Sequence, residues 1–521
     1  MNQIYLDHAA TTPPLPEVCD TMISYMKSEW GNPSSLYDFS DEPRRAVLDA
    51  RAHTAALIHA DPKRIFFTSG GSESDSWALI GCARLLRCKG NHIIVSAIEH
   101  HAILHAAAFL EDEGFEVTYL MPDTAGFIHP ENLLKAMRPD TILVSIMMAN
   151  NEIGTIQPIS DLAYIAHTNG CEGCLFHTDA VQAYGQIPID VKRLGVDLLS
   201  ASAHKIYGPK GIGLLYIRDG VTLTPLIFGG GQESGIRGGT ENVPAIAGFG
   251  VAAKIAFNQM RATMRHEIAL RNYLIQRVLH EIPFCQLNGS HQNRLPGNAN
   301  FSFEYVEGSS LLMMLDAQGI CASSGSACAS SSAEPSHVLT AIGLSDELAH
   351  ASLRLTLGRN TTKKELDTVV SILKETTDAK IIGTFGYKSS KDTDKFDGIN
   401  FKEISEIPVL ENTCGYMVCK VIDTMETSTH TIFLGEVIEA DDYSTENAMT
   451  YKYYHENLKG SSPKNAPTYE ETSISQVDKD SKKSKWKCSI CGYIHEADEL
   501  PDDFKCPICG VGKEYFELVE D

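Results

Sequence analysis

Short apolar runs alternate with helical stretches over the first part of the chain, up to about residue 380. Segments such as 131–138 ("ENLLKAMR") and 159–168 ("ISDLAYIAHT") repeat apolar residues every three or four positions, which is typical of helices. The apolar runs each end in polar residues: "RIFFTSGGSES", "HIIVSAIEH", "TILVSIMMANNE" and "CLFHTDAVQ". Strands that are buried on both faces have this pattern. We therefore predict an α/β fold with a mostly parallel sheet and with functional side chains at the carboxyl ends of its strands.

The same pattern predicts the division of this part into two domains. A long helix is expected over residues 256–280, because apolar positions continue there without a breaker. We expect a large domain at about 14–255 and a small domain formed by 1–13 and 256–383.

Beyond residue 383 the chain changes character. A polar linker is expected at 384–396, and a β-rich segment with two long strands around a polar turn at 397–467. A second linker, rich in serine, proline and charge, follows at 468–484, and a compact tail occupies 485–521.

Composition narrows the class of protein. The 521 residues carry a net charge of −23, and residues 386–521 contribute 15 basic and 27 acidic side chains. Such an acidic chain is not expected to bind nucleic acid, which requires basic surfaces. The start, "MNQIYLDHAATTPP", lacks the features of a secretory signal, and no run of 18 apolar residues occurs. We expect a cytoplasmic protein without a membrane span, whose 14 cysteines are thiols and metal ligands.

The tail contains two CxxC pairs separated by fourteen residues: Cys488, Cys491, Cys506 and Cys509. This spacing predicts a tetrahedral site of four thiolates, for which zinc and iron are both suitable. The flanking "CGYI" and "LPDDFKCP" closely resemble rubredoxin. The resemblance implies a single iron and a one-electron carrier, with zinc as the alternative. An isolated CxxC at Cys171 and Cys174 is expected to be a surface turn, and a redox pair is the alternative.

A lysine, an acid and a phosphate-binding turn form the main candidate site. Lys205 follows the apolar "VDLLS" run, and Asp179 and His100 each end a predicted strand. The "TSGGSES" turn at 68–74 offers amides and hydroxyls to a phosphate at a helix N-terminus. Taken alone, Lys205 would be interpreted as an ordinary surface lysine. Together, however, these residues describe a pyridoxal phosphate site, with the lysine as Schiff base and the acid facing the pyridine nitrogen.

The order of motifs along residues 1–380 resembles the cysteine desulfurases of the NifS/IscS type. These motifs are "YLDHAATTP", "GNPSSLY", "TSGGSES", "EHHAI", "NNEIGTIQPI", "HTDAVQAYGQIPID", "SAHKIYGPKGIGLLYIR", "GGGQESGIRGGTENVP", "SSGSAC" and "SLRLTLGR". Such enzymes belong to the class V aminotransferase family and have the fold type I architecture. The resemblance implies a homodimer whose active site lies at the subunit interface. It also implies conversion of L-cysteine to L-alanine.

The resemblance assigns roles to individual residues. It makes Lys205, Cys328 and His100 catalytic. Lys205 would bind the coenzyme covalently, Asp179 would pair with its ring nitrogen, Gln182 would bond its ring oxygen, and His100 would stack on the ring. The other implied coenzyme contacts are Gly71, Ser72, Asn151, Ser202, His204 and, from the second subunit, Thr240. Arg354 would bind the substrate carboxylate, assisted by Asn32 and Asn151.

Cys328 lies in a polar stretch of small residues, "SSGSACASSSAEP" at 323–335. A nucleophile that must reach the coenzyme and then deliver sulfur needs such a mobile support. The resemblance implies that Cys328 becomes a persulfide and passes its sulfur to an acceptor, such as an iron–sulfur scaffold protein. The alternative is an ordinary thiol in a loop. Cys321, at the edge of an apolar run, is expected in the core.

Residues 397–467 resemble the C-terminal half of flavin reductase domains of the FMN-binding split-barrel type. The half that carries most flavin contacts is missing, so this segment alone does not predict bound FMN. Cys414 and Cys419 are expected to be strand residues.

Two other functions are compatible with the sequence. One is a different pyridoxal enzyme, a class V aminotransferase or a selenocysteine lyase, which would not need Cys328. The other is an electron-transfer protein whose desulfurase-like part scaffolds the metal centre. In either case the tail would require a redox partner.

Overall fold

The computed structural model describes residues 3–304, 306, 308–324, 334–376, 401–405, 407–410, 415–426, 431–442, 485–488, 494–496, 513 and 516–519. The chain divides into two compact units, which we describe separately. The first comprises Met1–Tyr416 with Asp442–Lys459, and the second Met417–Asp441 with Gly460–Asp521.

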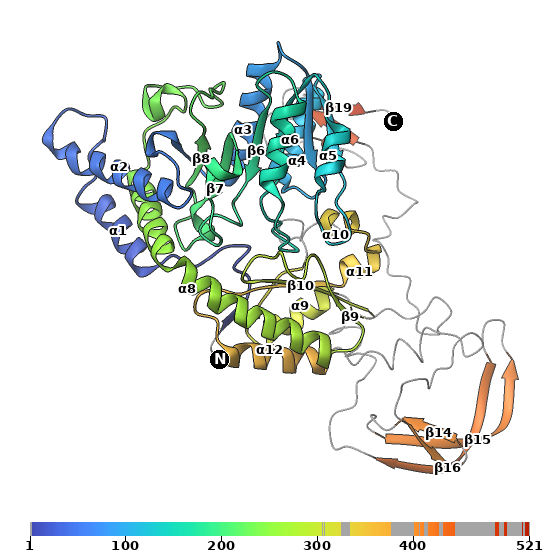
Figure 1. Ribbon diagram of the computed structural model, residues 1–521. Coiled ribbons are helices and arrows are strands. Elements are labelled where there is room, and N and C mark those ends of the chain that lie inside the picture. Colours follow the sequence, from blue (N-terminus) through green and yellow to red (C-terminus); the bar gives the residue numbers. More distant parts are fainter. Residues whose placement is uncertain are drawn as a thin grey trace. The chain divides into compact units, whose positions relative to one another are not determined.

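A seven-stranded sheet forms the centre of the first unit (Figure 1). In order, its strands are β2 (Ile65–Thr68), β8 (Gly213–Ile217), β7 (Leu198–Ser202), β6 (Leu175–Asp179), β5 (Thr141–Ser145), β3 (His92–Ser96) and β4 (Glu116–Leu120). The neighbours from β7 to β4 are parallel, and only β8 pairs antiparallel, with both β7 and β2. This confirms the predicted fold class, a mostly parallel α/β sheet.

Helices cover both faces of this sheet. The connection from β3 to β4 runs in the opposite direction along the sheet from those between β4, β5 and β6. Right-handed crossovers therefore place α4 on the face opposite to α5 and α6. The helices are α1 (Pro16–Lys27), α2 (Asp41–Ala56), α3 (Gly71–Leu86), α4 (His101–Asp112), α5 (Pro130–Ala136), α6 (Ile159–Asn169) and α7 (Val191–Leu194), with 3₁₀ turns η1 (Asp38–Ser40), η2 (Pro62–Arg64), η3 (Ala203–Lys205) and η4 (Gln232–Gly235).

The long helix α8 (Val243–Glu281) leads from the large sheet to a smaller antiparallel one. It begins well before the predicted residue 256, because Asn242 caps it by accepting a hydrogen bond from the amide of Ala245. The smaller sheet has the order β12 (Ser352–Thr356), β10 (Asn298–Phe303), β9 (Cys285–Leu287). Around it are β1 (Ile4–Tyr5), β11 (Ile320–Cys321), α9 (Gly308–Ala317), α10 (His337–Ala341), α11 (Asp346–His350) and α12 (Lys363–Thr376).

Two hydrophobic cores match these two sheets. The larger core includes Trp77 of α3 and Phe249 of α8. The smaller core joins Leu6 to Phe301 and Leu353 of the antiparallel sheet. The N-terminal segment is therefore built into the smaller core, although it precedes the large sheet in sequence.

Most of the described residues beyond 400 lie in strands. One antiparallel pair is β13 (Phe401–Ile404) with β14 (Ile407–Leu410), and a two-stranded sheet joins β15 (Gly415–Glu426) to β16 (Thr431–Asp442). The second pair corresponds to the two long strands predicted around a polar turn. In the tail, β17 (Lys485–Cys488) lies between β18 (Ile494–Glu496) and β19 (Phe516–Val519).

Several cysteines are placed differently from their predicted positions. Cys171 and Cys174 form the predicted surface turn, in which Glu172 and Gly173 are exposed, but both thiols are buried. They pack at the start of β6, where apolar neighbours exclude water. Cys321 is only half-buried, because its strand β11 is short and the fully buried position belongs to Ile320. Cys419 is in β15 as predicted, and Cys414 lies outside the described residues.

Candidate active site

A cavity of about 450 Å³ opens beside the carboxyl ends of β6 and β7 and the N-termini of α3 and α4. The carboxyl ends of parallel strands meet at one edge of a sheet, so side chains distant in sequence converge there. Ten of the residues assigned from the sequence line this cavity: Gly71, Ser72, His100, Asn151, Asp179, Gln182, Ser202, His204, Lys205 and Arg354.

Lys205 ends η3, the turn that directly follows β7. Its Nζ donates hydrogen bonds to the carbonyl oxygens of Ala9, at 2.5 Å, and Ala10, at 2.7 Å. Gln182 Nε2 also donates to the Ala9 carbonyl, at 3.0 Å. Backbone carbonyls of the N-terminal segment therefore hold the amine at the wall of the cavity.

Asp179 is the last residue of β6 and is buried. Its Oδ1 accepts a hydrogen bond from the amide of Val181 at 2.8 Å. Burial raises the pKa of this carboxyl, while the Val181 amide and the positive charge of Lys205 lower it. A nearby positive charge therefore stabilises the ionised form of Asp179. The protonated ring nitrogen of a coenzyme would provide such a charge.

Two histidines of the cavity are neutral near pH 7. Burial, followed by the charge of Lys205, lowers the pKa of His100 to about 4, and burial lowers that of His204 to about 4 as well. His100 caps α4, since its Nδ1 accepts from the amide of Ala102 at 3.1 Å. The cap uses Nδ1 and so fixes the orientation of the imidazole. The neutral ring is suited to stack on an aromatic ligand.

The start of α3 forms an anion-binding corner. Helix N-termini favour negative charge, and the hydroxyls of Ser72 and Ser202 line the cavity at this point. Gly71 is required by space, because a Cβ there would lie 2.8 Å from the Val181 side chain. A phosphate fits these donors.

Arg354 lies on β12 and is only 2% exposed. Its Nη2 donates to Asp7 Oδ1 at 3.0 Å, and its Nη1 donates to the carbonyl of Asn151 at 3.2 Å. Its Nε is buried and has no hydrogen-bond partner among the described residues. The guanidinium is therefore held in place at the wall of the cavity, where a substrate carboxylate could be bound.

Asn32 and Thr240 are described by the structure and do not line the cavity. Asn32 is exposed, and its side-chain oxygen accepts from the amide of Ser34 at 2.9 Å. Thr240 is also exposed. Cys328 and the tail residues Cys491, Cys506 and Cys509 lie outside the described residues, and Cys488 ends β17.

Four ionisable side chains of the cavity were not predicted from the sequence: Asp75, Glu152, His101 and His337. Asp75 follows Gly71 by four positions, which is one helical turn, so this spacing was the available signal. Glu152 lies within "NNEIG" beside the predicted Asn151. It accepts a hydrogen bond from the Ser336 hydroxyl, at 2.5 Å, and burial raises its pKa to about 7.

The donor set fits pyridoxal phosphate. An amine, a buried acid, a neutral imidazole and an anion-binding helix start surround one cavity of suitable size. The Arg354 guanidinium also lines this cavity and provides a cation for the carboxylate of an amino-acid substrate.

Comparisons with known families divide the chain in the same way. The class-V aminotransferase family model matches residues 4–369, a flavin reductase-like domain matches 317–462, and the rubrerythrin, rubredoxin-like domain matches 486–517. The flavin reductase-like match overlaps the first one. Among described residues, it includes the hairpin of β15 and β16.

Similar proteins include two groups of curated desulfurases. The chain is 52% identical over 372 residues to cysteine desulfurase IscS of Methanosarcina thermophila, covering 71% of this chain and 91% of that protein. It is 48% identical over 375 residues to the mitochondrial cysteine desulfurase of Saccharomyces cerevisiae, covering 71% and 74%.

Solved structures agree with these matches. A NifS-like protein superposes with a TM-score of 0.67 and 36% identity, covering 72% of this chain and 99% of that one. SspA in complex with cysteine superposes with a TM-score of 0.60 and 37% identity, covering 69% and 100%. The chain belongs to the class-V aminotransferase family, and within it to the cysteine desulfurases of the IscS type.

Proposed function

We propose that the protein converts L-cysteine to L-alanine with pyridoxal phosphate at Lys205, and that Cys328 receives the sulfur as a persulfide. The observation that carries this proposal is the single cavity that contains the Lys205 amine, the buried Asp179 carboxyl and the Arg354 guanidinium. Identity of about half to curated cysteine desulfurases supports the choice of substrate.

Different residues of the cavity would bind different parts of the coenzyme. Lys205 would bind it covalently, Asp179 would pair with its ring nitrogen, and Gln182 would bond its ring oxygen. His100 would cover the ring, and Gly71, Ser72, Ser202 and His204 would hold the phosphate. Bound in this way, the coenzyme withdraws electrons from the Cα atom of an amino-acid substrate.

The chain's own groups then act on the substrate. Arg354 would bind the carboxylate, and the Lys205 amine would move the proton of Cα. His100 is neutral and assists by accepting a proton. The Cys328 thiolate attacks the substrate sulfur. An S–S bond forms and the C–S bond breaks, which leaves its electron pair on the substrate. Cβ then takes a proton, and Lys205 returns a proton to Cα to give alanine.

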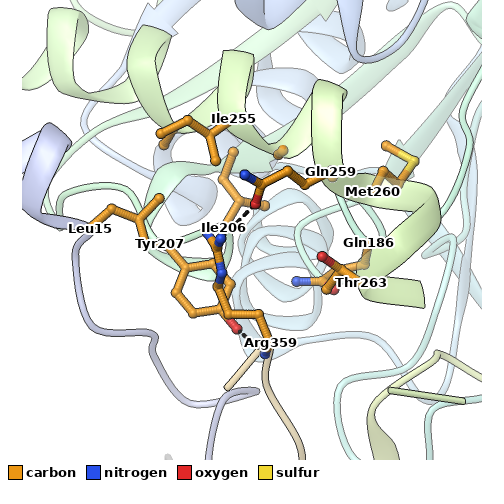
Figure 2. A pocket seen from close by; sticks show the side chains of 12 residues that line it. Leu15, Gln186, Ile206, Tyr207, Ile255, Gln259, Met260, Thr263 and Arg359 are labelled. Atoms are coloured by element: carbon orange, nitrogen blue, oxygen red, sulfur yellow. Dashed lines mark hydrogen bonds between the residues drawn. The ribbon is translucent and has the colours of Figure 1, made fainter. Parts of the chain in front are cut away.

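Replacement of Arg354 by lysine is expected to weaken substrate binding. Lysine keeps a charge but loses the paired donors that hold a carboxylate and the bond to Asp7, so KM for L-cysteine should rise and kcat/KM should fall about 10- to 100-fold. Steady-state alanine formation measures both. Arg359→Lys is the matched control, because Arg359 bonds Gln259 in a separate small pocket (Figure 2). An unchanged KM for Arg354→Lys would refute the assigned role.

We also propose that two subunits complete each active site. Asn32 and Thr240 are exposed in one chain, and large apolar side chains near them in sequence are exposed too: Trp30 at 70%, Leu36 at 100% and Phe228 at 78%. Exposed apolar groups of this size indicate a contact surface. A second copy that covers this surface would bring Thr240 to the phosphate, as the family resemblance implies.

For the tail, we propose one iron held by Cys488, Cys491, Cys506 and Cys509 as a one-electron carrier, with a separate protein as its redox partner. The rubredoxin-like match over 486–517 supports the ligand set. FMN binding by the hairpin segment is not part of this proposal. The recipient of the sulfur, an acceptor such as a scaffold protein, and the cytoplasmic location remain predictions from the sequence.

The double change Cys506→Ser with Cys509→Ser is expected to remove the metal. Two of four thiolates are lost, and iron no longer has a tetrahedral sulfur site. Metal analysis and the visible spectrum should show loss of about one iron per chain and of the red colour, with alanine formation intact. Cys419→Ser, an exposed cysteine of β15, is the control. A colourless parent protein that contains zinc would contradict the carrier role.

A further inference from the structure

A second carboxylic acid is buried in the coenzyme cavity beside Asp179. Asp75, on α3, is 1% exposed and lines the same cavity. Its Oδ1 has no hydrogen-bond partner among the described residues. The proposed mechanism gives this acid no task, yet a buried and unsatisfied carboxylate is costly.

The groups around Asp75 come from several elements. Strand β6 contributes Asp179 and His177, strand β7 contributes Ser200, and the segment after β3 contributes Glu99. His177 Nε2 lies 3.7 Å from Asp75 Oδ1, but burial lowers the pKa of this histidine to about 3, so it is neutral. Burial raises the pKa of Glu99 to about 8, so this acid is mostly protonated near pH 7.

His177 is held by hydroxyls rather than by charge. Its Nδ1 bonds Ser145 Oγ at 2.8 Å and its Nε2 bonds Ser200 Oγ at 2.9 Å. It therefore offers Asp75 no positive charge. Lys205 is the cation of this cavity that acts on Asp179.

Asp75 and Asp179 are both buried and line the same cavity. Two carboxylates in one buried site cannot both be ionised easily, so one retains a proton. Asp179 is favoured as the charged member, because it accepts the Val181 amide and lies in the field of Lys205. For Asp75, burial and the charge of Asp179 both raise the pKa. The hydrogen bond from the Ser200 hydroxyl lowers it.

We propose that Asp75 stays a neutral carboxylic acid near pH 7, so that Asp179 alone carries the negative charge facing the coenzyme ring. This inference rests on the proposed coenzyme role of the cavity. Asp75 holds the single proton of the pair. In this neutral form it adds no second negative charge near the ring nitrogen.

The sign of the pH effect follows from the raised pKa. The folded protein keeps a proton on Asp75 that the unfolded chain releases above about pH 4. Stability due to this proton is present at low pH and is lost as pH rises toward the pKa of the folded state. An asparagine at position 75 cannot lose a proton, so this part of the pH dependence should vanish.

Thermal unfolding of the coenzyme-loaded protein tests this directly. The Tm difference between Asp75→Asn and wild type should move in favour of the variant by about 3 °C or more from pH 5 to about pH 8. Asp112→Asn, an exposed aspartate of α4, should show no such trend. A difference that is constant with pH would overturn the proposal.

Rebinding of pyridoxal phosphate to the resolved full-length protein separates this inference from the proposed function. Asp75→Asn should bind within about threefold of wild type, while Asp179→Asn should lose more than about tenfold in affinity. Equal losses in both variants would overturn the neutral state of Asp75 and leave the function standing. If Asp179→Asn binds normally, the proposed coenzyme site itself fails.

A measurement on the wild-type protein covers the case in which Asp75→Asn does not fold. Infrared spectra with isotopically labelled aspartate should show a protonated carboxyl band near neutral pH. Absence of this band would equally overturn the proposal.

Discussion

Replacement of Lys205 by alanine is expected to lower alanine formation from L-cysteine by about 10⁴-fold. The Lys205 amine is the group that the cavity walls orient, through the carbonyls of Ala9 and Ala10, and no other lysine lines the cavity in the described part of the chain. The variant loses both the covalent link to the coenzyme and the proton carrier at Cα. Alanine and sulfide assays measure the loss, and the visible spectrum should lose the band of the lysine-bound coenzyme.

The matched control for this change is Lys210→Ala. Lys210 is exposed and follows Lys205 by five positions on the same Gly-Pro turn, but it does not line the cavity. Its replacement should leave alanine formation within about twofold of wild type, in line with an ordinary surface change. Substantial turnover by Lys205→Ala would show that another group binds the coenzyme.

Replacement of Cys328 by serine is expected to lower sulfur release from L-cysteine by at least about 10³-fold. A hydroxyl of the same size cannot accept sulfur as a persulfide, so the C–S bond is not broken by this route. Coenzyme binding should be unchanged, because the residues that hold it come from other segments. Persulfide on the wild-type chain should be detected by mass spectrometry after incubation with L-cysteine and be absent from the variant.

Cys321→Ser is the control for Cys328. Its thiol is half-buried and accepts a hydrogen bond from Gln3 Nε2 at 3.0 Å, in a position that needs no mobility. The control should retain activity. Full sulfur release by Cys328→Ser, on the other hand, would favour an enzyme that needs no such thiol, such as an aminotransferase or a selenocysteine lyase.

The parts of the site at strand ends were predictable from the sequence. Asp179 ends an apolar strand and Lys205 follows one, and a parallel sheet brings such ends to one edge. The mostly parallel sheet itself was also predictable, because its strands are apolar on both faces.

Other parts could not be read from the sequence, for physical reasons. Asp75 lies inside a helix, where a lone acid is normally a solvent-facing residue, and only the packing of α3 against β6 and β7 buries it. Ala9 and Ala10 contribute backbone carbonyls. Every residue has such a carbonyl, so the residue type does not indicate this role. The buried thiols of Cys171 and Cys174 depend on neighbours from distant segments.

Reduction of the coenzyme-loaded protein with borohydride, followed by digestion and peptide mass spectrometry, tests the central claim most directly. The account predicts one stable adduct, on the peptide that contains Lys205, formed in wild type and absent from Lys205→Ala. An adduct on a different lysine, or a protein that binds no pyridoxal phosphate, would contradict it.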